Sequence, residues 1–334
     1  MDELERRLLR RVWMPVARLT DLADSPVLGA RILDTSLVVY RIDDQITVAD
    51  GACPHRGAAM WTGTLDGDTL RCPYHGWRFA GGTGACVEVP SLPPDAPLPR
   101  VSLRTYPVRT AYDHVWTCLD DPYLPFPDLP SVFDASWRTV AGRPLDVGCG
   151  LRTLTENFRD AAHFPFVHVE SLGKDVPQIV NPYQVVRDGW ELTWSVTLTS
   201  RDGAQEPPTE PFVYNHVLPA FTTIRILWPD GFERVLGQVA VPVTAEGDRV
   251  RLFWFAGERV DASTGEVSPR FGAGLISEEA VFLEDIRVVE QIVPTEAPLS
   301  LTGQAHTRAD RFSIAYRQAY RELLDEFAKG GDRP

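Results

Sequence analysis

The chain has 334 residues, of which 44% are hydrophobic and 24% are charged, so it is long and apolar enough for two globular domains with separate cores. Its formal net charge of −13 argues against a nucleic-acid partner, because binding phosphates requires a basic surface. No apolar run approaches the ~18 residues of a membrane span. The N-terminal residues are also too highly charged for a signal peptide. We therefore expect a globular protein that binds neither nucleic acid nor membrane.

The N-terminal part of the chain is predicted to be a small β domain. Residues 1–10 suggest a short charged helix or an extension. From residue 12 to residue 120, short apolar segments alternate with turns, which is typical of an all-β domain. The segments expected to contain strands are Ala30–Leu33, Leu37–Ile42, Ile46–Ala49, the region of Leu70, Val87–Val89, Val101–Tyr106 and Val115–Leu119.

Two fragments within this domain, Cys53-Pro54-His55-Arg56-Gly57 and Cys72-Pro73-Tyr74-His75-Gly76-Trp77, each offer one thiolate and one imidazole. Two cysteines on one iron and two histidines on the other form the ligand pattern of a Rieske [2Fe-2S] centre. Because imidazoles leave the cluster less negative than thiolates do, its reduction potential is high. These four residues therefore predict a protein that transfers electrons one at a time.

A structural zinc site is the alternative reading of the same four side chains, since Zn²⁺ also accepts two sulfur and two nitrogen ligands. Zinc sites usually pair ligands of one kind in each loop. Here each loop carries one of each, with proline after the cysteine and glycine soon after the histidine. We therefore favour the iron–sulfur cluster over zinc.

The other cysteines, Cys86, Cys118 and Cys149, lack metal-ligand spacing. We expect them to be small buried side chains rather than members of disulfides. This cysteine usage indicates a reducing, cytoplasmic compartment.

A second domain is predicted beyond a proline-rich linker. Four prolines fall within residues 121–130, so we place a linker at 121–135 and the second domain at 136–330. Asp188-Gly189 and Asp230-Gly231 are hairpin signals. The strands expected around them are Tyr183–Val186, Glu191–Thr199, Phe221–Trp228, Phe232–Val243 and Val250–Glu258, and the helices are Ser277–Val293 and Arg308–Lys329. An antiparallel sheet with packed helices places the domain in the α+β class.

The segment from Thr155 to His168 is a candidate metal site. Asn157, Asp160 and His163 recur every three residues and would share one side of a helix. The proline at position 165 should end that helix near Phe164. The chain could then turn back and bring His168 to the same point as His163, giving a pair of imidazole ligands.

Asp285 is the carboxylate expected to complete this site. Helical spacing places it on an apolar stripe with Val281, Val288, Val289 and Ile292. An unpaired carboxylate there would be strongly unfavourable, so a metal ion is a natural partner. Two histidines and one carboxylate form the facial triad of non-haem Fe(II) oxygenases.

Two other readings of this helix remain open. The neighbouring Glu284 is the weaker ligand candidate, because it falls on the more polar side of the helix. Asp285 could instead pair with an arginine or with a helix N-terminus, in which case no metal would be needed.

Together these motifs resemble the Rieske non-haem iron oxygenases, specifically the terminal oxygenase (alpha) subunits of the single-subunit homotrimeric type. The resemblance rests on the two cluster loops, on residues 156–168 and on Glu284-Asp285-Ile286. The closing segment, Asp310–Arg317, is similar to that of vanillate O-demethylases and hydroxylases of aromatic and polycyclic natural products. The resemblance implies a Rieske domain followed by a helix-grip-like catalytic domain.

The resemblance also implies roles for individual residues. Cys53 and Cys72 would bind one cluster iron, and His55 and His75 the other. His163, His168 and Asp285 would bind mononuclear Fe(II), with Asn157 beside it. Asp160 would connect a cluster histidine of the neighbouring subunit to an iron ligand, so electrons would cross between subunits of a head-to-tail homotrimer.

The activity implied is monooxygenation, by hydroxylation or demethylation, of an aromatic or polycyclic small molecule with O2. Because the chain has no nucleotide-binding G-x-G-x-x-G motif after a strand, NAD(P)H electrons would arrive through a separate reductase, with or without a ferredoxin. Ring cis-dihydroxylation and desaturation are alternatives at the same site. A non-catalytic Rieske electron carrier is a further alternative, which would leave the second metal site idle.

Two other features have competing interpretations. Leu145–Gly150 resembles the first motif of S-adenosylmethionine methyltransferases, which requires a parallel α/β fold, but its surroundings indicate antiparallel strands. His216 could face a substrate cavity or be a hydrogen-bonded sheet residue. The aromatic residues within Phe221–Trp228 and Phe253–Phe255 could line that cavity or pack in the core.

Overall fold

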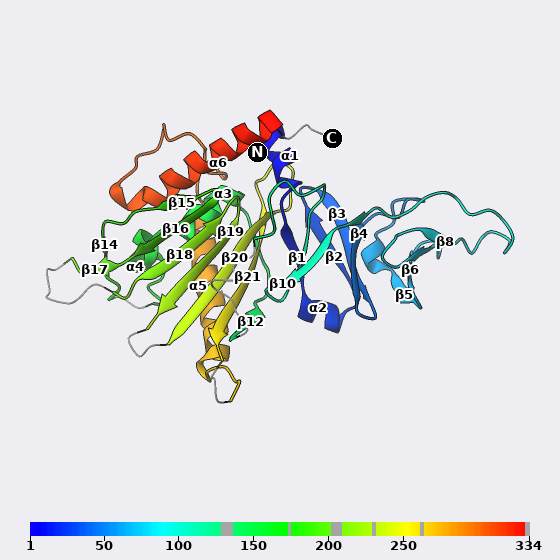
Figure 1. The fold of residues 1–334 in the computed structure, drawn as a ribbon, viewed down its shortest axis with the longest axis horizontal. Helices are drawn as coiled ribbons and strands as arrows, with labels where there is room; N and C mark the ends of the chain where they lie inside the picture. Colours follow the sequence, from blue (N-terminus) through cyan, green and yellow to red (C-terminus); the bar gives the residue numbers. More distant parts are fainter. Residues whose placement is uncertain (128–135, 173–174, 202–208, 229–231, 261–263, 331–334) are drawn as a thin grey trace. The chain divides into compact units, whose positions relative to one another are not determined.

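The computed structural model of the chain describes residues 1–127, 136–172, 175–201, 209–228, 232–260 and 264–330. The chain divides into two compact units, coloured along the sequence in Figure 1. One comprises Arg6–Phe126 with Val243–Ala245, and the other comprises Met1–Glu5, Pro127–Pro242 and Glu246–Pro334. Residues 128–135 of the proposed linker lie outside the described residues. The limits 12–120, 121–135 and 136–330 therefore remain a proposal for the domain organisation.

The smaller unit is built mainly of β-strands, as predicted, and these form antiparallel sheets. Its described sheets have the strand orders β1-β11-β10, β2-β3-β4-β9 and β5-β6-β7-β8. The helix α2 and the first strand were not predicted. The elements are α1 (Glu3–Leu9), which belongs to this unit only from Arg6 onward, β1 (Met14–Arg18), α2 (Leu19–Asp24), β2 (Val27–Ile32), β3 (Thr35–Ile42), β4 (Gln45–Asp50), η1 (Met60–Thr62), β5 (Thr64–Asp66), β6 (Thr69–Arg71), β7 (Arg78–Ala80), β8 (Cys86–Glu88), β9 (Thr105–Tyr106), β10 (Val108–Ala111) and β11 (His114–Thr117).

The larger unit is organised around one antiparallel sheet. Its path is β12-β21-β20-β19-β18-β16-β15, with β13 also paired to β21, while β14 pairs with β17. The elements are β12 (Trp137–Ala141), β13 (Leu145–Val147), α3 (Leu151–Asn157), η2 (Ala161–His163), α4 (Phe164–Val167), β14 (Ile179–Val180), β15 (Val186–Asp188), β16 (Glu191–Val196), β17 (Leu198–Thr199), β18 (Phe212–Val217), β19 (Phe221–Leu227), β20 (Glu233–Pro242), β21 (Val250–Arg259), α5 (Arg270–Val289), η3 (Arg308–Asp310) and α6 (Arg311–Gly330).

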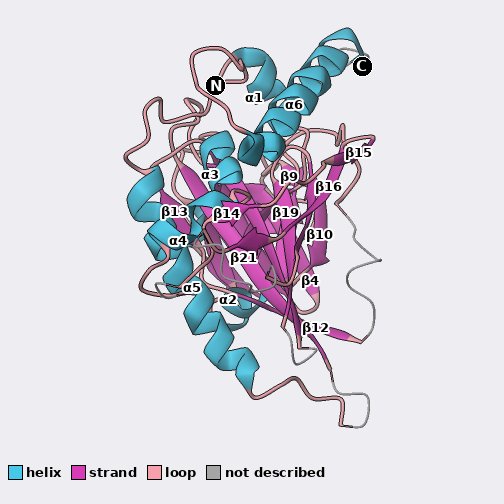
Figure 2. Cartoon of the chain, turned by 90° about the vertical axis from the view of Figure 1, so that its left-hand side faces the viewer, coloured by secondary structure: helices cyan, strands magenta, loops and turns pink. Residues whose placement is uncertain are grey.

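Helices cover the face of this sheet that carries a row of paired apolar residues. The row runs across four strands through Trp194, Tyr214, Ile224 and Leu236. Phe312 of α6 stacks on Trp194, with ring centroids 4.3 Å apart. Figures 1 and 2 show α5 along the sheet and α6 across one end of it. The α+β class predicted from the sequence is confirmed.

Several element limits differ from the prediction. The hairpin at Asp188-Gly189 joins β15 to β16, and Gly189 adopts a left-handed φ of +55°. The strand expected at Tyr183–Val186 begins only at its last residue, and Glu191–Thr199 is divided between two sheets. β18 was not predicted, and α5 begins and ends earlier than expected. The second hairpin signal, Asp230-Gly231, lies outside the described residues.

The methyltransferase reading of Leu145–Gly150 is wrong. A strand followed by a helix is present, as β13 and α3, but β13 pairs antiparallel with β21. A methyltransferase motif requires a parallel sheet at this point.

The cysteines outside the two motifs form no disulfides, as expected, and two of the three are buried. All five cysteines are free thiols, with Cys118 and Cys149 buried and Cys86 half-buried.

Among the described residues, none of the helices combines the length and the apolar composition that crossing a bilayer requires.

A close contact inside the sheet gives a test of this packing. Gly237 of β20 lies opposite Phe255 of β21, and a Cβ at Gly237 would lie 2.0 Å from the Phe255 ring. We therefore expect Gly237→Ala to lower the free energy of unfolding by about 1–3 kcal/mol through overpacking. Urea unfolding followed by circular dichroism measures this loss. Gly272→Ala, at an exposed helical position with no atom within 4 Å of the added methyl group, is the control and should be neutral or slightly stabilising.

Candidate active site

The two cysteine–histidine motifs form a matched pair of loops in the smaller unit. One follows β4, and the other joins β6 to β7. In each loop the amide of a glycine donates to the carbonyl of the cysteine four residues before it, from Gly57 to Cys53 at 2.8 Å and from Gly76 to Cys72 at 3.1 Å. Both glycines have left-handed φ values, +71° and +70°. Because glycine adopts this conformation without steric cost, its presence after each histidine is explained by the turn.

The donor atoms of these loops suit a [2Fe-2S] cluster. Cys53 and Cys72 are buried in the core, whereas His75 is exposed and His55 is half-buried. The imidazole rings are 4.7 Å apart between centroids, and His55 stacks on Trp77 at 4.4 Å. Burial, together with the neighbouring Cys72 thiol, raises the pKa of Cys53 to about 11. The thiolate therefore needs a cation beside it, as a cluster iron would supply.

The single helix predicted to carry Asn157, Asp160 and His163 is not present. α3 ends at Asn157, and η2 and α4 follow as separate short turns. Asp160 caps η2, with its Oδ1 accepting a hydrogen bond at 2.8 Å from the amide two residues on. Pro165 lies within α4, because the first turn of a helix has no amide hydrogen bonds to lose. The expected helix end at Phe164 is therefore wrong.

These turns nevertheless bring His163, His168 and Asp285 to one point. The two Nε2 atoms are 3.0 Å apart, and Asp285 Oδ1 lies 3.2 Å from the Nε2 of His163 and 3.4 Å from that of His168. Metal–ligand bonds of about 2.1 Å at right angles would place donor atoms about 3.0 Å apart. The three donors therefore have the spacing of one face of an octahedron. This spacing fits the mononuclear iron that the sequence predicts.

The charges around the donors favour a cation. Burial lowers the pKa of His163, but the carboxylates of Asp160 and Asp285 outweigh burial and raise it to about 9. Asp160 Oδ2 is 3.6 Å from His163 Nδ1, which is too long for a hydrogen bond. Asn157 contacts the third donor residue, with its Nδ2 donating to Asp285 Oδ1 at 3.3 Å. Both residues thus lie beside the triad, as the resemblance implies.

Asp285 is buried on α5, at 2% exposure, but the apolar stripe predicted around it is only partly correct. Val289 is fully buried, whereas Val288 and Ile292 are 43% and 38% exposed. The contacts of Asp285 Oδ1 are with the two histidines and Asn157. These contacts support the metal-ligand reading rather than a pairing with arginine or a helix N-terminus.

Glu284 has a role that the sequence did not indicate. It was expected on the polar side of its helix, but it is only 7% exposed. Its Oε2 lies 2.8 Å from His168 Nδ1 and accepts a hydrogen bond from Ser171 Oγ at 2.7 Å. When His168 Nδ1 donates to this carboxylate, Nε2 keeps its lone pair for the metal. No sequence pattern could show this contact, because 116 positions separate His168 from Glu284 and only the tertiary structure brings them together.

This contact gives a second test. We expect Glu284→Gln to weaken Fe(II) binding or activity about 10–100-fold, because loss of the carboxylate leaves His168 less well oriented and less basic. Fe(II) titration of the metal-depleted protein measures the effect. Glu279→Gln on the same helix, where the carboxylate pairs with Arg143, is the matched control and should bind iron normally. Equal affinities in the two variants would contradict the role assigned to Glu284.

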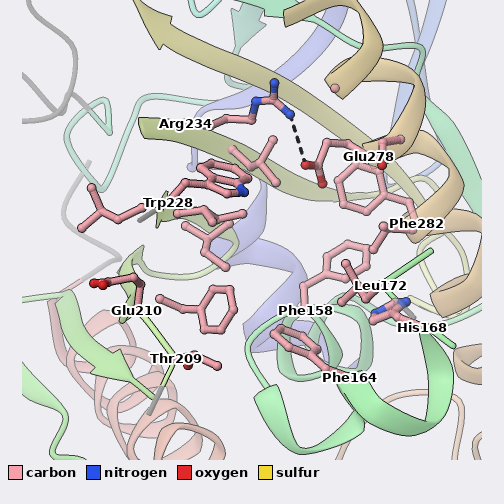
Figure 3. Close-up of a pocket in the computed structure, with 18 of the residues that line it drawn as sticks. Phe158, Phe164, His168, Leu172, Thr209, Glu210, Trp228, Arg234, Glu278 and Phe282 are labelled. Atoms are coloured by element: carbon pink, nitrogen blue, oxygen red, sulfur yellow. Dashed lines mark ion pairs between the residues drawn. The ribbon is translucent and has the colours of Figure 1, made fainter. Parts of the chain in front are cut away.

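A cavity of about 730 Å³ opens on the triad (Figure 3). Its described walls are mainly aromatic and aliphatic and include Phe158, Phe164, Phe212, Trp228, Phe232 and Phe282. This volume suits a drug-sized molecule. The lining therefore provides an apolar site beside the predicted iron.

Two of the open readings of the sequence are now decided. His216 is fully buried, contacts Thr222 and is absent from the described cavity lining, so it is a sheet residue. Phe253–Phe255 are likewise not among the described lining residues, whereas Trp228 is.

Comparisons with known proteins agree with both parts of this site. Residues 12–107 match the model of the Rieske [2Fe-2S] domain, and residues 147–326 match that of the vanillate O-demethylase oxygenase C-terminal domain. The chain is 28% identical over 338 residues to methylxanthine N1-demethylase NdmA of Pseudomonas putida, covering 98% of this chain and 92% of the relative. It is 34% identical over 186 residues to the oxygenase component of dicamba O-demethylase of Stenotrophomonas maltophilia, covering 54% of each chain.

Solved structures show the same fold. The structure of Pseudomonas putida CBB5 NdmA with caffeine superposes with a TM-score of 0.78 at 26% identity, covering 98% of this chain and 94% of that one. Both cofactor sites fit the residues present, a [2Fe-2S] cluster in the smaller unit and mononuclear iron in the larger. The chain therefore belongs to the Rieske non-haem iron oxygenases whose catalytic domain is of the vanillate O-demethylase type.

Proposed function

We propose that this protein is the oxygenase component of a monooxygenase that removes an O- or N-linked methyl group from an aromatic small molecule. The observation that carries the proposal is the facial arrangement of His163, His168 and Asp285 at the wall of an aromatic cavity. The names of its relatives, a methylxanthine N1-demethylase and a dicamba O-demethylase, support demethylation.

The side chains have separate tasks in this proposal. His163, His168 and Asp285 would hold Fe(II), which supplies O2 activation when bound. Glu284 holds the ring of His168, and Asn157 holds the carboxylate of Asp285. The apolar walls exclude water and orient the ring of the substrate, so that its methyl group faces the triad. In the balanced reaction, one methyl ether or N-methyl group reacts with O2, two electrons and two protons. The products are the free hydroxyl or amine, formaldehyde and water.

The electrons would come from NAD(P)H through a separate reductase, with or without a ferredoxin. Cys53, His55, Cys72 and His75 would hold the cluster that receives them. We propose a cytoplasmic homotrimer in which the cluster of one subunit serves the iron of the next, with Asp160 on the route between them. The half-exposed carboxylate of Asp160, 3.6 Å from an iron-binding imidazole, supports this role.

A substrate screen tests the proposal. The cofactor-loaded protein and a surrogate reductase are supplied with aromatic O- and N-methyl compounds, and O2 uptake and formaldehyde are measured. Substrate-dependent O2 uptake with an equivalent amount of formaldehyde is the expected result. A cis-diol product would instead identify ring dihydroxylation, a new double bond would identify desaturation, and reduction of the cluster without O2 uptake would identify an electron carrier.

A further inference from the structure

A buried ionic cluster closes one end of the cavity. Arg234 on β20 is 5% exposed and pairs with Glu258 on β21, whose side chain is 1% exposed, at 2.5 Å. Glu278 on α5 also faces Arg234, but at 3.6 Å, beyond hydrogen-bond length. Glu258 is therefore the close partner of the guanidinium. Figure 3 shows Glu278 and Arg234 at the end of the cavity away from His168.

The fold makes room for this cluster. An ideal Cβ at Gly274, one turn before Glu278 on α5, would lie 2.0 Å from a guanidinium nitrogen of Arg234. Gly274 is thus required for the close approach of helix and arginine. Arg234 and Glu278 both belong to the cavity lining, whereas Glu258 is not among the described lining residues.

Among the residues that the structure describes in this cluster, one carboxylate is in excess. Arg234 carries one positive charge and faces two carboxylates, those of Glu258 and Glu278. Burial raises the pKa of Glu278 to about 7, and the nearby Arg234 only partly opposes this effect. Glu278 is buried and its ion pair with Arg234, at 3.6 Å, is a long one, so its charge is only partly compensated. A ligand group that donates a hydrogen bond or carries positive charge would relieve that cost.

The helix sets the distance between this carboxylate and the metal site. Glu278 precedes Asp285 by seven residues, so both side chains project from nearly the same side of α5 at positions about 10 Å apart along its axis. A molecule that reaches both ends must therefore be about as long as two fused rings with one substituent at each end. The walls between the two ends include the aromatic rings of Phe158 and Phe282.

We propose that Glu278 is a specificity-determining residue, which selects aromatic substrates that carry an amine or another hydrogen-bond donor opposite the methyl group and rejects aromatic carboxylates. This inference rests on the demethylase function proposed above and adds the chemical class of its substrate. Arg234 does not attract a carboxylate, because Glu258 already neutralises it within the sheet. Glu210 is also among the described lining residues, but it is exposed to solvent and its carboxylate points away from the cavity in Figure 3.

The test uses four methoxynaphthalenes of one shape that differ at the end of the ring system away from the methoxy group. They carry an aminomethyl, a hydroxymethyl, a methyl or a carboxylate group. Their affinities for the cofactor-loaded protein are measured by anaerobic calorimetry, and formaldehyde release is measured separately with a surrogate reductase. Wild-type protein, Glu278→Gln and the matched control Glu279→Gln are compared, with cluster absorbance and melting temperature as checks of folding.

The aminomethyl compound should bind wild-type protein about tenfold or more tightly than the methyl compound, since hydrogen bonds to charged groups contribute more than neutral ones. The hydroxymethyl compound should lie between them, and the carboxylate should bind most weakly. Glu278→Gln should reduce the preference for the amine by about tenfold or more, while Glu279→Gln should keep the wild-type order.

The inference is overturned if the carboxylate binds wild-type protein as tightly as the amine, if none of the four compounds binds, or if Glu278→Gln keeps the wild-type order. The wild-type affinities are decisive even if the variant does not fold. Binding in the expected order without formaldehyde from any compound would contradict the demethylase proposal and leave the specificity intact. Formaldehyde release with the carboxylate preferred would contradict the specificity alone.

Discussion

His163→Ala should abolish substrate turnover and leave the Rieske cluster intact. His163 supplies one of the three donors that lie 3.0–3.4 Å from one another, and alanine has no donor to replace it. Since a bound metal contributes several kcal/mol to catalysis, activity should fall at least about a thousandfold. The measurements are turnover with a surrogate reductase, iron content, and the visible absorption of the cluster.

The contrast between the two metal sites makes this experiment informative. The variant should lose the mononuclear iron and keep the cluster iron, and His168→Ala should behave in the same way. Glu279→Gln, on the surface of the same unit, should retain both iron and turnover. Full substrate turnover in His163→Ala would refute the assignment of the catalytic iron to the site formed by His163, His168 and Asp285.

Two inactive variants should restore each other's activity when they are produced together. Cys72→Ser removes a cluster ligand and should leave the mononuclear site, whereas His163→Ala should do the reverse. If electrons pass from the cluster of one subunit to the iron of the next, a mixed trimer contains productive pairs. With random mixing, about a quarter of the subunit interfaces would be productive, so about a quarter of the wild-type activity is expected.

Co-expression, followed by gel filtration and a turnover assay, measures this effect. Mixing the two purified variants without subunit exchange is the control and should give no activity. The absence of activity in co-expressed mixed trimers would show that electrons remain within one subunit. It would also remove the reason for assigning Asp160 to a route between subunits.

The cluster loops are the part of the site that could be predicted best from the sequence. Cys53 and Gly57, like Cys72 and Gly76, are four residues apart and joined by a local hydrogen bond, so their geometry depends on a short segment. Local patterns of this kind are read directly from the chain. The ligand types, one cysteine and one histidine in each loop, were sufficient to assign the two loops to one cluster.

The second site could be predicted only in its chemistry. The residue types of His163, His168 and Asp285 pointed to a facial triad, but periodicity wrongly predicted one helix running from Asn157 through Asp160 to its end near Phe164. A capping carboxylate interrupted the helix, and a proline was accommodated in the first turn of the next one. Helix propensity does not show whether a side chain such as that of Asp160 will lie within a helix or cap the start of a new one, because the surrounding structure decides between the two.

By itself the sequence determined the cofactor types, the α+β class and the residue types of the iron site. These features follow from short motifs and from the alternation of apolar and polar residues. Only the tertiary structure decided that Glu284 holds His168, that His216 belongs to the sheet, and that Arg234, Glu258 and Glu278 meet at the end of the cavity. These contacts join strands and helices that are distant in the chain. The side chains become buried, and their charges come close to one another, only when the sheet and α5 pack together.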